Sequence, residues 1–324
     1  MHTITSELHF DEMIRSAKAL ATVAAWSKAG HFRQLHDEGP IPLESLDGDP
    51  RALRITARLL EYLGLLTRSE ELFALTPAGR RLVDNGLLTT DRHLRSFTAL
   101  SRMDAVLDGG GPVPDEDGER QATAVGVNPD DEEYNRQFMD MLFRRSEDTA
   151  RACARWIAPR LAPGARVLDL GGGHGRYARE FTRAGLQATL MDLPEVLPFA
   201  KERHGDALTY REGDFFSDDL GGPYDAIFLS NIVHGLGPEE NLQLARRTAN
   251  ALAPGGLLIL KDMFLDTFER SPAQPVYFAL TMLFYTDHGD SYCIDEAHRW
   301  FTDAGLTPAA PALLDGFQLL FATK

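Results

Sequence analysis

The sequence predicts a two-part protein, in which a mainly α-helical winged-helix domain precedes an α/β Rossmann-like domain with a mostly parallel sheet. In the second part, short apolar runs at 166–170, 188–191, 207–210, 226–230 and 257–261 alternate with helical stretches. Such alternation is typical of a parallel sheet with helices on both faces and ligands at the carboxyl ends of its strands. The first run passes directly into Gly171-Gly172-Gly173-His174-Gly175, which also supports this fold.

The glycine run predicts a nucleotide-like ligand, because glycines between a strand and a helix let the backbone approach a ligand closely. Gly171 and Gly173 lie in this run, and Asp192 would end the next strand, where a carboxylate binds ribose hydroxyls. Asp214 and Phe215 follow the third strand, where an acid and an aromatic ring suit adenine. A pyrophosphate-binding loop also fits. Asp169 would repel phosphate, so the pattern favours S-adenosylmethionine.

Composition narrows the class of partner. The 324 residues are 44% hydrophobic and 25% charged, which is typical of a globular protein long enough for two domains. A formal net charge of −15 opposes binding to nucleic acid or to an anionic membrane. Two cysteines, Cys153 and Cys293, indicate a reducing compartment. The N-terminal residues resemble neither a signal peptide nor a membrane anchor, so we expect a cytoplasmic protein.

The N-terminal region predicts the winged helix. Apolar residues keep a helical period from Phe10 to Ala25, a short helix is expected at 43–46, and a third helix begins at Pro50. Two apolar runs, 64–67 and 72–76, then form a two-stranded wing. Winged helices often bind DNA, and Arg51, Arg54 and Arg58 fit that use. The overall acidity and the cofactor fold favour dimerisation instead.

These patterns predict domain boundaries and a pocket. We expect a winged-helix domain at 1–108, a connection with linking helices at 109–160, and a cofactor-binding domain at 161–324. The first part of the connection, 109–130, carries Gly109-Gly110-Gly111-Pro112 and Asp115-Glu116-Asp117 and is expected to be exposed. The linking helices would partly line a substrate pocket. The candidate pocket residues are Phe138, Met141 and Arg145 before the second domain, and Phe278, Met282, Tyr285 and His288 within it.

Together these motifs resemble a family, the S-adenosylmethionine-dependent small-molecule O-methyltransferases of the caffeate and acetylserotonin type, including bacterial natural-product enzymes. The resemblance rests on the winged helix, on Val167 to Gly175, and on three further motifs: Met191-Asp192-Leu193-Pro194, Gly213-Asp214-Phe215-Phe216 and Ala251-Leu252-Ala253-Pro254-Gly255-Gly256. It implies a seven-stranded methyltransferase domain, a homodimer that shares N-terminal domains, and a small, aromatic secondary metabolite as substrate.

The family's cofactor roles carry over residue by residue. Gly171 and Gly173, next to Asp169, would border the methionine part, Asp192 with Leu193 the ribose, and Asp214 with Phe215 the adenine. The resemblance also places a cofactor-binding lysine at the end of the fourth strand. This chain has Ser230 there, so one cofactor contact differs.

The resemblance implies that His234 is a general base for phenol methylation, since imidazole titrates near neutral pH. Family spacing places Asp262 as its orienting acid. A second acid of the family corresponds to Ser291, unless Asp290 replaces it through a shift of register. The base machinery is therefore altered.

Three alternatives stay open. One is a C-methyltransferase of an α-keto acid or similar substrate, with a metal held by His234 and His288 and by Asp262. Another is a winged-helix regulator that senses S-adenosylmethionine. The third is a methyltransferase fold used for a different reaction.

Overall fold

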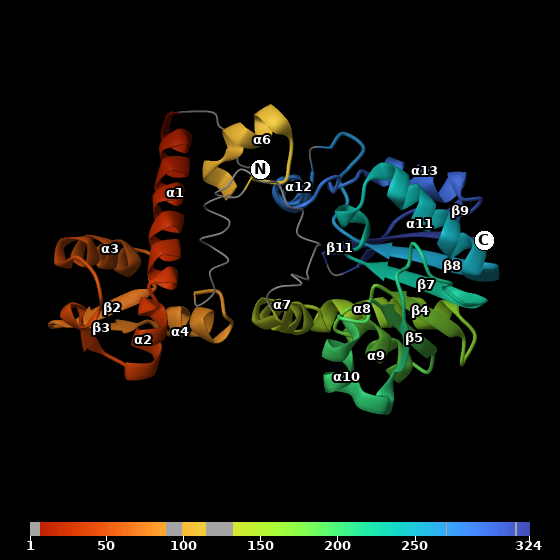
Figure 1. The fold of residues 1–324 in the computed structure, drawn as a ribbon, viewed down its shortest axis with the longest axis horizontal. Coiled ribbons are helices and arrows are strands. Elements are labelled where there is room, and N and C mark those ends of the chain that lie inside the picture. The colour runs from red at the N-terminus through yellow and green to blue at the C-terminus, as the bar shows by residue number, and fades with distance from the viewer. Residues whose placement is uncertain (1–6, 89–98, 115–131, 270, 315) are drawn as a thin grey trace. The chain divides into compact units, whose positions relative to one another are not determined.

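The computed structural model describes residues 7–88, 99–114, 132–269, 271–314 and 316–324 (Figure 1). Within these ranges the chain divides into two compact units, Met1–Leu107 and Asp108–Lys324. The first unit is the smaller, and the second carries the large sheet. Most of the expected connection at 109–130 lies outside the described residues.

The first unit is mainly α-helical and carries one small sheet. Its helices are α1 (Glu7–Lys28), α2 (His31–Glu38), α3 (Pro50–Tyr62) and α4 (Pro77–Asp84), with a 3-10 turn at Leu43–Ser45. Helix α3 starts where Asp49 accepts a hydrogen bond from the Ala52 backbone N–H, with Pro50 in the first turn. A three-stranded sheet, in the order β1-β3-β2, joins β1 (Ile41–Pro42), β2 (Leu66–Ser69) and β3 (Leu72–Leu75).

The third-helix arginines Arg51, Arg54 and Arg58 are exposed, as a solvated helix face requires. Two short helices of this unit, α2 and α4, were not among the predicted elements. Helix α4 carries a start signal in the sequence, because Thr76 caps the Gly79 N–H and Pro77 follows it.

The second unit is built around one mostly parallel sheet. Its order is β10-β11-β8-β7-β4-β5-β6, and β9 pairs with β11 outside that path. The strands are β4 (Arg166–Leu170), β5 (Gln187–Asp192), β6 (Thr209–Glu212), β7 (Tyr224–Ser230), β8 (Leu252–Lys261), β9 (Thr307–Pro308), β10 (Ala312–Leu314) and β11 (Phe317–Thr323). The sheet therefore has eight strands rather than seven, because the short β9 also pairs with β11.

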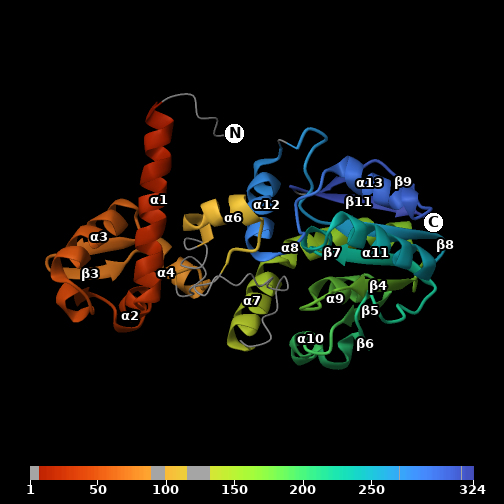
Figure 2. The same ribbon diagram turned by 45° about the horizontal axis from the view of Figure 1, so that its top comes forward.

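Helices cover both faces of this sheet (Figures 1 and 2). One face packs against α8 (Glu147–Ile157), α9 (Arg176–Arg183) and α10 (Leu197–His204), and the other against α11 (Pro238–Ala251) and α13 (Ile294–Asp303). Helix α7 (Glu132–Arg145) precedes α8, and α12 (Ala273–Tyr285) follows β8. Helix α6 (Met103–Gly109) spans the boundary between the units.

The glycine-proline stretch after α6 is not the exposed segment that its composition predicts. The Val113 backbone N–H donates to the Phe284 carbonyl, and Pro112 and Pro114 are buried. A Cβ on Gly111 would lie 1.7 Å from the Leu283 carbonyl oxygen, so only glycine allows this close approach to α12. No helix among the described residues is long and apolar enough to cross a membrane.

Candidate functional site

The glycine loop joins β4 to α9 and is held close to two neighbouring segments. The Gly171 N–H donates to the Met191 carbonyl at the end of β5. A Cβ on Gly171 would lie 2.5 Å from Cδ1 of Ile232, which follows β7. The loop therefore keeps its position only with glycine there, and it lies between the ends of β5 and β7.

Asp169 lies beneath the loop rather than in it. Its side chain is fully buried, and Oδ2 accepts a hydrogen bond from the Ala178 N–H in α9. A Cβ on Gly172 would come within 2.8 Å of this carboxyl group, and Oδ1 has no hydrogen-bond partner among the described residues. Burial raises the pKa of Asp169 to about 7, against the lowering effect of the Ala178 hydrogen bond. The geometry favours support of the loop over contact with a ligand.

An Asp169→Asn variant is expected to flatten the pH dependence of stability. The raised pKa means that the folded state holds this proton more tightly than the unfolded state, so stability falls as pH rises from about 4 to about 7. Burial also raises the pKa of Asp192, to about 6. Asp192 therefore also makes stability fall as pH rises, and this part of the decline remains in the variant. Urea unfolding across this pH range should show a decline smaller by about 1 kcal/mol or more. Parallel curves for wild type and variant would contradict this, and exposed Asp206→Asn is the control.

Asp192 ends β5 and fixes the loop on its other side. Its Oδ2 accepts from the Gly173 N–H at 2.7 Å, and Oδ1 accepts from the Leu193 N–H at 2.8 Å. Each carboxylate oxygen has a further lone pair for a ligand hydroxyl. Leu193 is exposed beside this carboxylate.

Asp214 and Phe215 follow β6, as the sequence predicts. The Asp214 carboxylate accepts from the Phe216 N–H, and Phe215 contacts Phe216 edge to face. An open cavity of about 440 Å³ includes Leu193 and Asp214 in its lining. The Phe215 ring is also within 3.9 Å of the Cβ that Gly171 lacks, so these residues border the loop.

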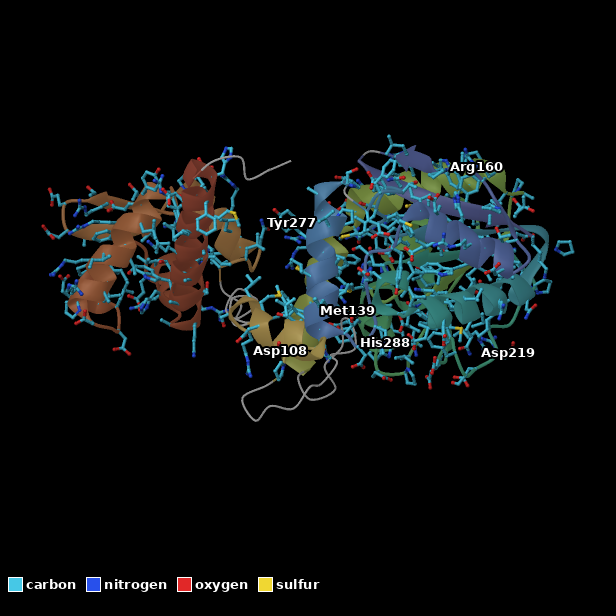
Figure 3. The ribbon with its side chains drawn as sticks, turned by 90° about the horizontal axis from the view of Figure 1, so that it is seen from above. Asp108, Met139, Arg160, Asp219, Tyr277 and His288 are labelled. Carbon is cyan, nitrogen blue, oxygen red and sulfur yellow. The ribbon has the colours of Figure 1, made fainter. Side chains whose placement is uncertain are left out.

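Helix α7 meets the loop through residues that the sequence did not single out. Met139 is buried, and its sulfur lies 3.7 Å from where a Cβ on Gly173 would be. Figure 3 labels Met139 on this helix. Phe138 and Met141 are only partly buried, and Arg145 is exposed. The guanidinium of Arg176 lies 3.5 Å from the centre of the Phe143 ring, and Arg203 forms an ion pair with Asp140. These contacts fix which side of α7 faces the loop.

Ser230 lies at the end of β7, in a polar cluster. Its hydroxyl accepts from the Asn231 side-chain amide and hydrogen-bonds to Tyr177 of α9. Asn231 in turn accepts from the Lys261 ammonium at 2.9 Å. Ser230 pairs with Lys261 in the parallel register of β7 and β8. A lysine is therefore present beside the position where the family's lysine is missing, but it comes from the neighbouring strand.

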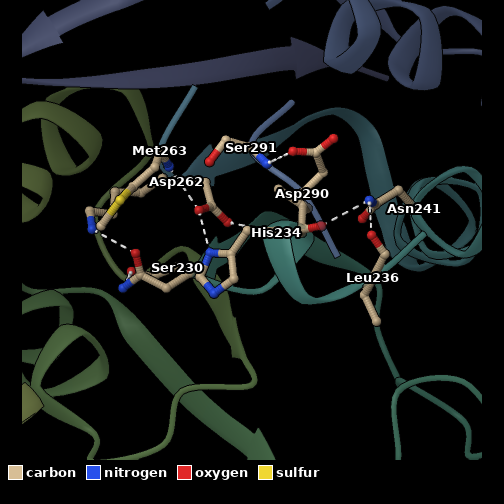
Figure 4. A network of polar contacts seen from close by, with 11 residues as sticks. Ser230, His234, Leu236, Asn241, Asp262, Met263, Asp290 and Ser291 are labelled. Carbon is tan, nitrogen blue, oxygen red and sulfur yellow. Dashed lines mark hydrogen bonds and ion pairs between the residues drawn. The ribbon is translucent and has the colours of Figure 1, made fainter. Parts of the chain in front are cut away.

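His234 and Asp262 form a buried pair. His234 lies in a short 3-10 turn after β7, and Asp262 directly follows β8 (Figure 4). The His234 Nδ1 lies 2.6 Å from Oδ1 of Asp262, and the Met263 N–H donates to the same carboxylate. Burial alone would raise the pKa of Asp262, but attraction and hydrogen bonding to His234 outweigh it and lower the pKa. The ionised carboxylate favours a proton on Nδ1, so Nε2 keeps a free lone pair.

No second acid bonds to His234 among the residues that the structure describes. The Asp290 backbone N–H donates to the His234 carbonyl, but the Asp290 carboxylate turns to the Ser291 N–H (Figure 4). Ser291 is buried, and its hydroxyl has no partner in the described part of the chain. In the described part of the chain, Asp262 is therefore the one carboxylate that bonds to this imidazole.

Helix α12 brings some of the predicted pocket residues to His234. Phe278 meets the imidazole edge to face, with ring centres 4.9 Å apart. Met282 is buried and Tyr285 partly buried on the same helix, whereas Tyr277 projects outward (Figure 3). His288 is exposed, and its Cβ lies against Gly237. The described residues contain no cluster of three His, Cys, Asp or Glu side chains that suits a metal.

Comparison with known proteins gives a consistent result. A family model described as the O-methyltransferase domain matches residues 117–307. The tetracenomycin polyketide synthesis 8-O-methyl transferase of Streptomyces glaucescens is 35% identical over 156 residues, 46% of each chain. The 3-hydroxy-5-methyl-1-naphthoate 3-O-methyltransferase of Streptomyces sahachiroi is 32% identical over 201 residues, 60% of this chain and 55% of the relative. The chain spans about half the length of the curated relatives it matches.

Solved structures match over nearly the whole chain. A structure of PigF with SAH has a TM-score of 0.83 at 21% identity and covers 98% of this chain and all of that one. Human N-acetylserotonin methyltransferase in complex with SAM has a TM-score of 0.75 at 20% identity, with 100% and 99% coverage. At these identities the likeness shows the fold alone.

Proposed function

The chain belongs to the O-methyltransferase domain family, and from this premise we propose that it transfers a methyl group from S-adenosylmethionine to a hydroxyl of a small aromatic secondary metabolite. The family depends on this cofactor. The substrate class is supported by relatives whose names specify a naphthoate and a polyketide. The observation that carries the proposal is the buried His234–Asp262 pair, at the same edge of the sheet as the glycine loop.

The described residues fit the cofactor. The Asp192 carboxylate keeps free lone pairs for the two ribose hydroxyls, and Asp214 with Phe215 offers an acceptor and a ring face for adenine. Gly171 and Gly173 allow the loop to pack closely against Ile232 and Met139, and we propose that the methionine part of the cofactor lies along this loop. When bound, the cofactor supplies an electrophilic methyl group on its sulfonium.

In the proposed mechanism, His234 Nε2 takes the proton from the substrate hydroxyl. Asp262 holds the imidazole in the required tautomer and stabilises the imidazolium that forms. Phe278 and Met282 help to form an apolar wall for a flat ring. Holding the nucleophile in line with the methyl group supplies most of the rate, so one orienting acid is sufficient.

The alternatives have less support. A metal held by both histidines has less support, because the described residues contain no cluster of three His, Cys, Asp or Glu side chains that suits a metal. The direct experiment is a panel of phenols and naphthols with S-adenosylmethionine, read by mass spectrometry. O-methylated product supports the proposal, whereas C-methylated product from an α-keto acid, or DNA binding that weakens with salt, would replace it.

We also propose a homodimer formed through the first unit. Helix α1 leaves Phe10, Met13 and Ile14 exposed on one side, an apolar surface that a second copy would bury. Met13→Lys is expected to convert a dimer into a monomer at micromolar concentration, as measured by analytical ultracentrifugation. Lys18→Ala on the same helix is the matched control. A variant that stays dimeric, or a wild type that is monomeric, would contradict this assembly.

A further inference from the structure

A partly buried lysine at the carboxyl end of an inner strand has no ion-pair partner among the described residues. Lys261 is the last residue of β8, and its ammonium donates to Asn231 Oδ1. In the described part of the chain, no carboxylate forms an ion pair with it. Asp262, the next residue, is already bound to His234 and to the Met263 N–H. Burial lowers the pKa of Lys261, because an ammonium is costly to desolvate, and the nearby charge of Asp262 offsets this only in part.

The Lys261 side chain lies on the side of the sheet that packs against α8 and α9. Side chains alternate along a strand, so Lys261 continues the row of Ile259, which packs in the core against α8 and α9. Asp262 continues the row of Leu260, which packs toward α11 and α13. The ammonium and the His234–Asp262 pair therefore face opposite sides of the sheet.

Short contacts connect this ammonium to the glycine loop. Asn231, which accepts from it, is followed by Ile232, the side chain that packs against Gly171. The pKa of His174 in the loop also reflects this charge: it is lowered to about 3, mainly by burial, and the Lys261 charge is one of the smaller contributions. The ammonium is thus close to the loop, on a residue that is partly buried.

We propose that Lys261 binds the carboxylate of the amino-acid part of the cofactor. The inference rests on the proposed function, because it assumes that S-adenosylmethionine binds over the loop. An ammonium has three donors, and among the described residues only one is used, by Asn231, so the others are available to an anion. His234, on the other side of the sheet, would take the proton from the substrate oxygen. The carboxylate of the cofactor is therefore the anion that we expect to lie near Lys261.

The test is calorimetric and does not depend on turnover. S-adenosylhomocysteine and its decarboxylated counterpart, which keeps the adenosine, the sulfur and the amine, are titrated into wild type, Lys261→Met, Lys261→Gln and Lys261→Arg. Wild type should prefer the carboxylate ligand by about tenfold or more, the usual size of a charged hydrogen bond. The two neutral variants should lose this preference and still bind the decarboxylated ligand, and Lys261→Arg should keep most of it. Lys201→Met, an exposed lysine of α10, controls for net charge.

The outcomes separate the two proposals. If wild type binds neither ligand, the proposed cofactor is wrong. If wild type binds both ligands and a neutral variant keeps the full preference, or weakens both ligands equally, Lys261 does not bind the carboxylate and the proposed function stands. Lys261→Gln can keep the Asn231 hydrogen bond, so it carries the test if Lys261→Met does not fold.

Discussion

His234→Ala is expected to lower kcat by about 10²- to 10⁴-fold, the usual contribution of a positioned general base. Cofactor affinity should be unchanged, because His234 and Asp262 bond to each other and to backbone groups near them, and not to the glycine loop. The loss should shrink as pH rises toward the phenol's own pKa of about 10, since the ionised substrate needs no base. Steady-state kinetics with a phenol that the wild type methylates, as a function of pH, measures this.

Two variants control this prediction. Asp262→Asn should lower kcat in the same direction, because it removes the charge that fixes the His234 tautomer. His36→Ala, in the first unit, should leave kcat unchanged. Full activity of His234→Ala at neutral pH would exclude His234 as the base.

Asp192→Ala is expected to weaken S-adenosylhomocysteine binding by about 10- to 100-fold, the value of a charged hydrogen-bond pair. The same change frees the Gly173 and Leu193 N–H groups that the carboxylate holds, so the loop also loses its shape. Since burial raises the pKa of Asp192 to about 6, wild-type affinity should fall as pH is lowered through that value. Calorimetric titration across this pH range measures both effects.

Glu195→Ala, an exposed acid on the same segment, is the matched control and should bind normally. Asp192→Asn should fall between wild type and alanine, because one acceptor oxygen remains. Unchanged affinity in Asp192→Ala would remove Asp192 from the cofactor site.

Residues that directly follow strands were the most predictable part of the site. Asp192 and Asp214 end up at one edge because the carboxyl ends of parallel strands meet there, and the sequence shows where those strands end. His234 and Asp262 meet for the same reason, since β7 and β8 are hydrogen-bonded neighbours. The order of the strands and the residues that follow them are sufficient to predict such positions.

The side of α7 that faces the loop was not predictable from the sequence. Met139 and Met141 are two positions apart on a helix rich in charged residues, and only the docking of Phe143 and Asp140 onto Arg176 and Arg203 selects Met139. These are tertiary contacts between distant segments, which helical period alone does not specify. Lys261 was missed for a related reason, because its partner Asn231 lies on another strand's end.

The most direct test of methyl transfer is incubation of the purified protein with S-adenosylmethionine that carries an isotopically labelled methyl group, together with a panel of phenols and naphthols. The proposed function predicts labelled methyl on a substrate oxygen and an equal amount of S-adenosylhomocysteine, with both abolished in the His234→Ala, Asp192→Ala double variant. Tight cofactor binding without label on any oxygen, or label on carbon, would contradict O-methylation by this site.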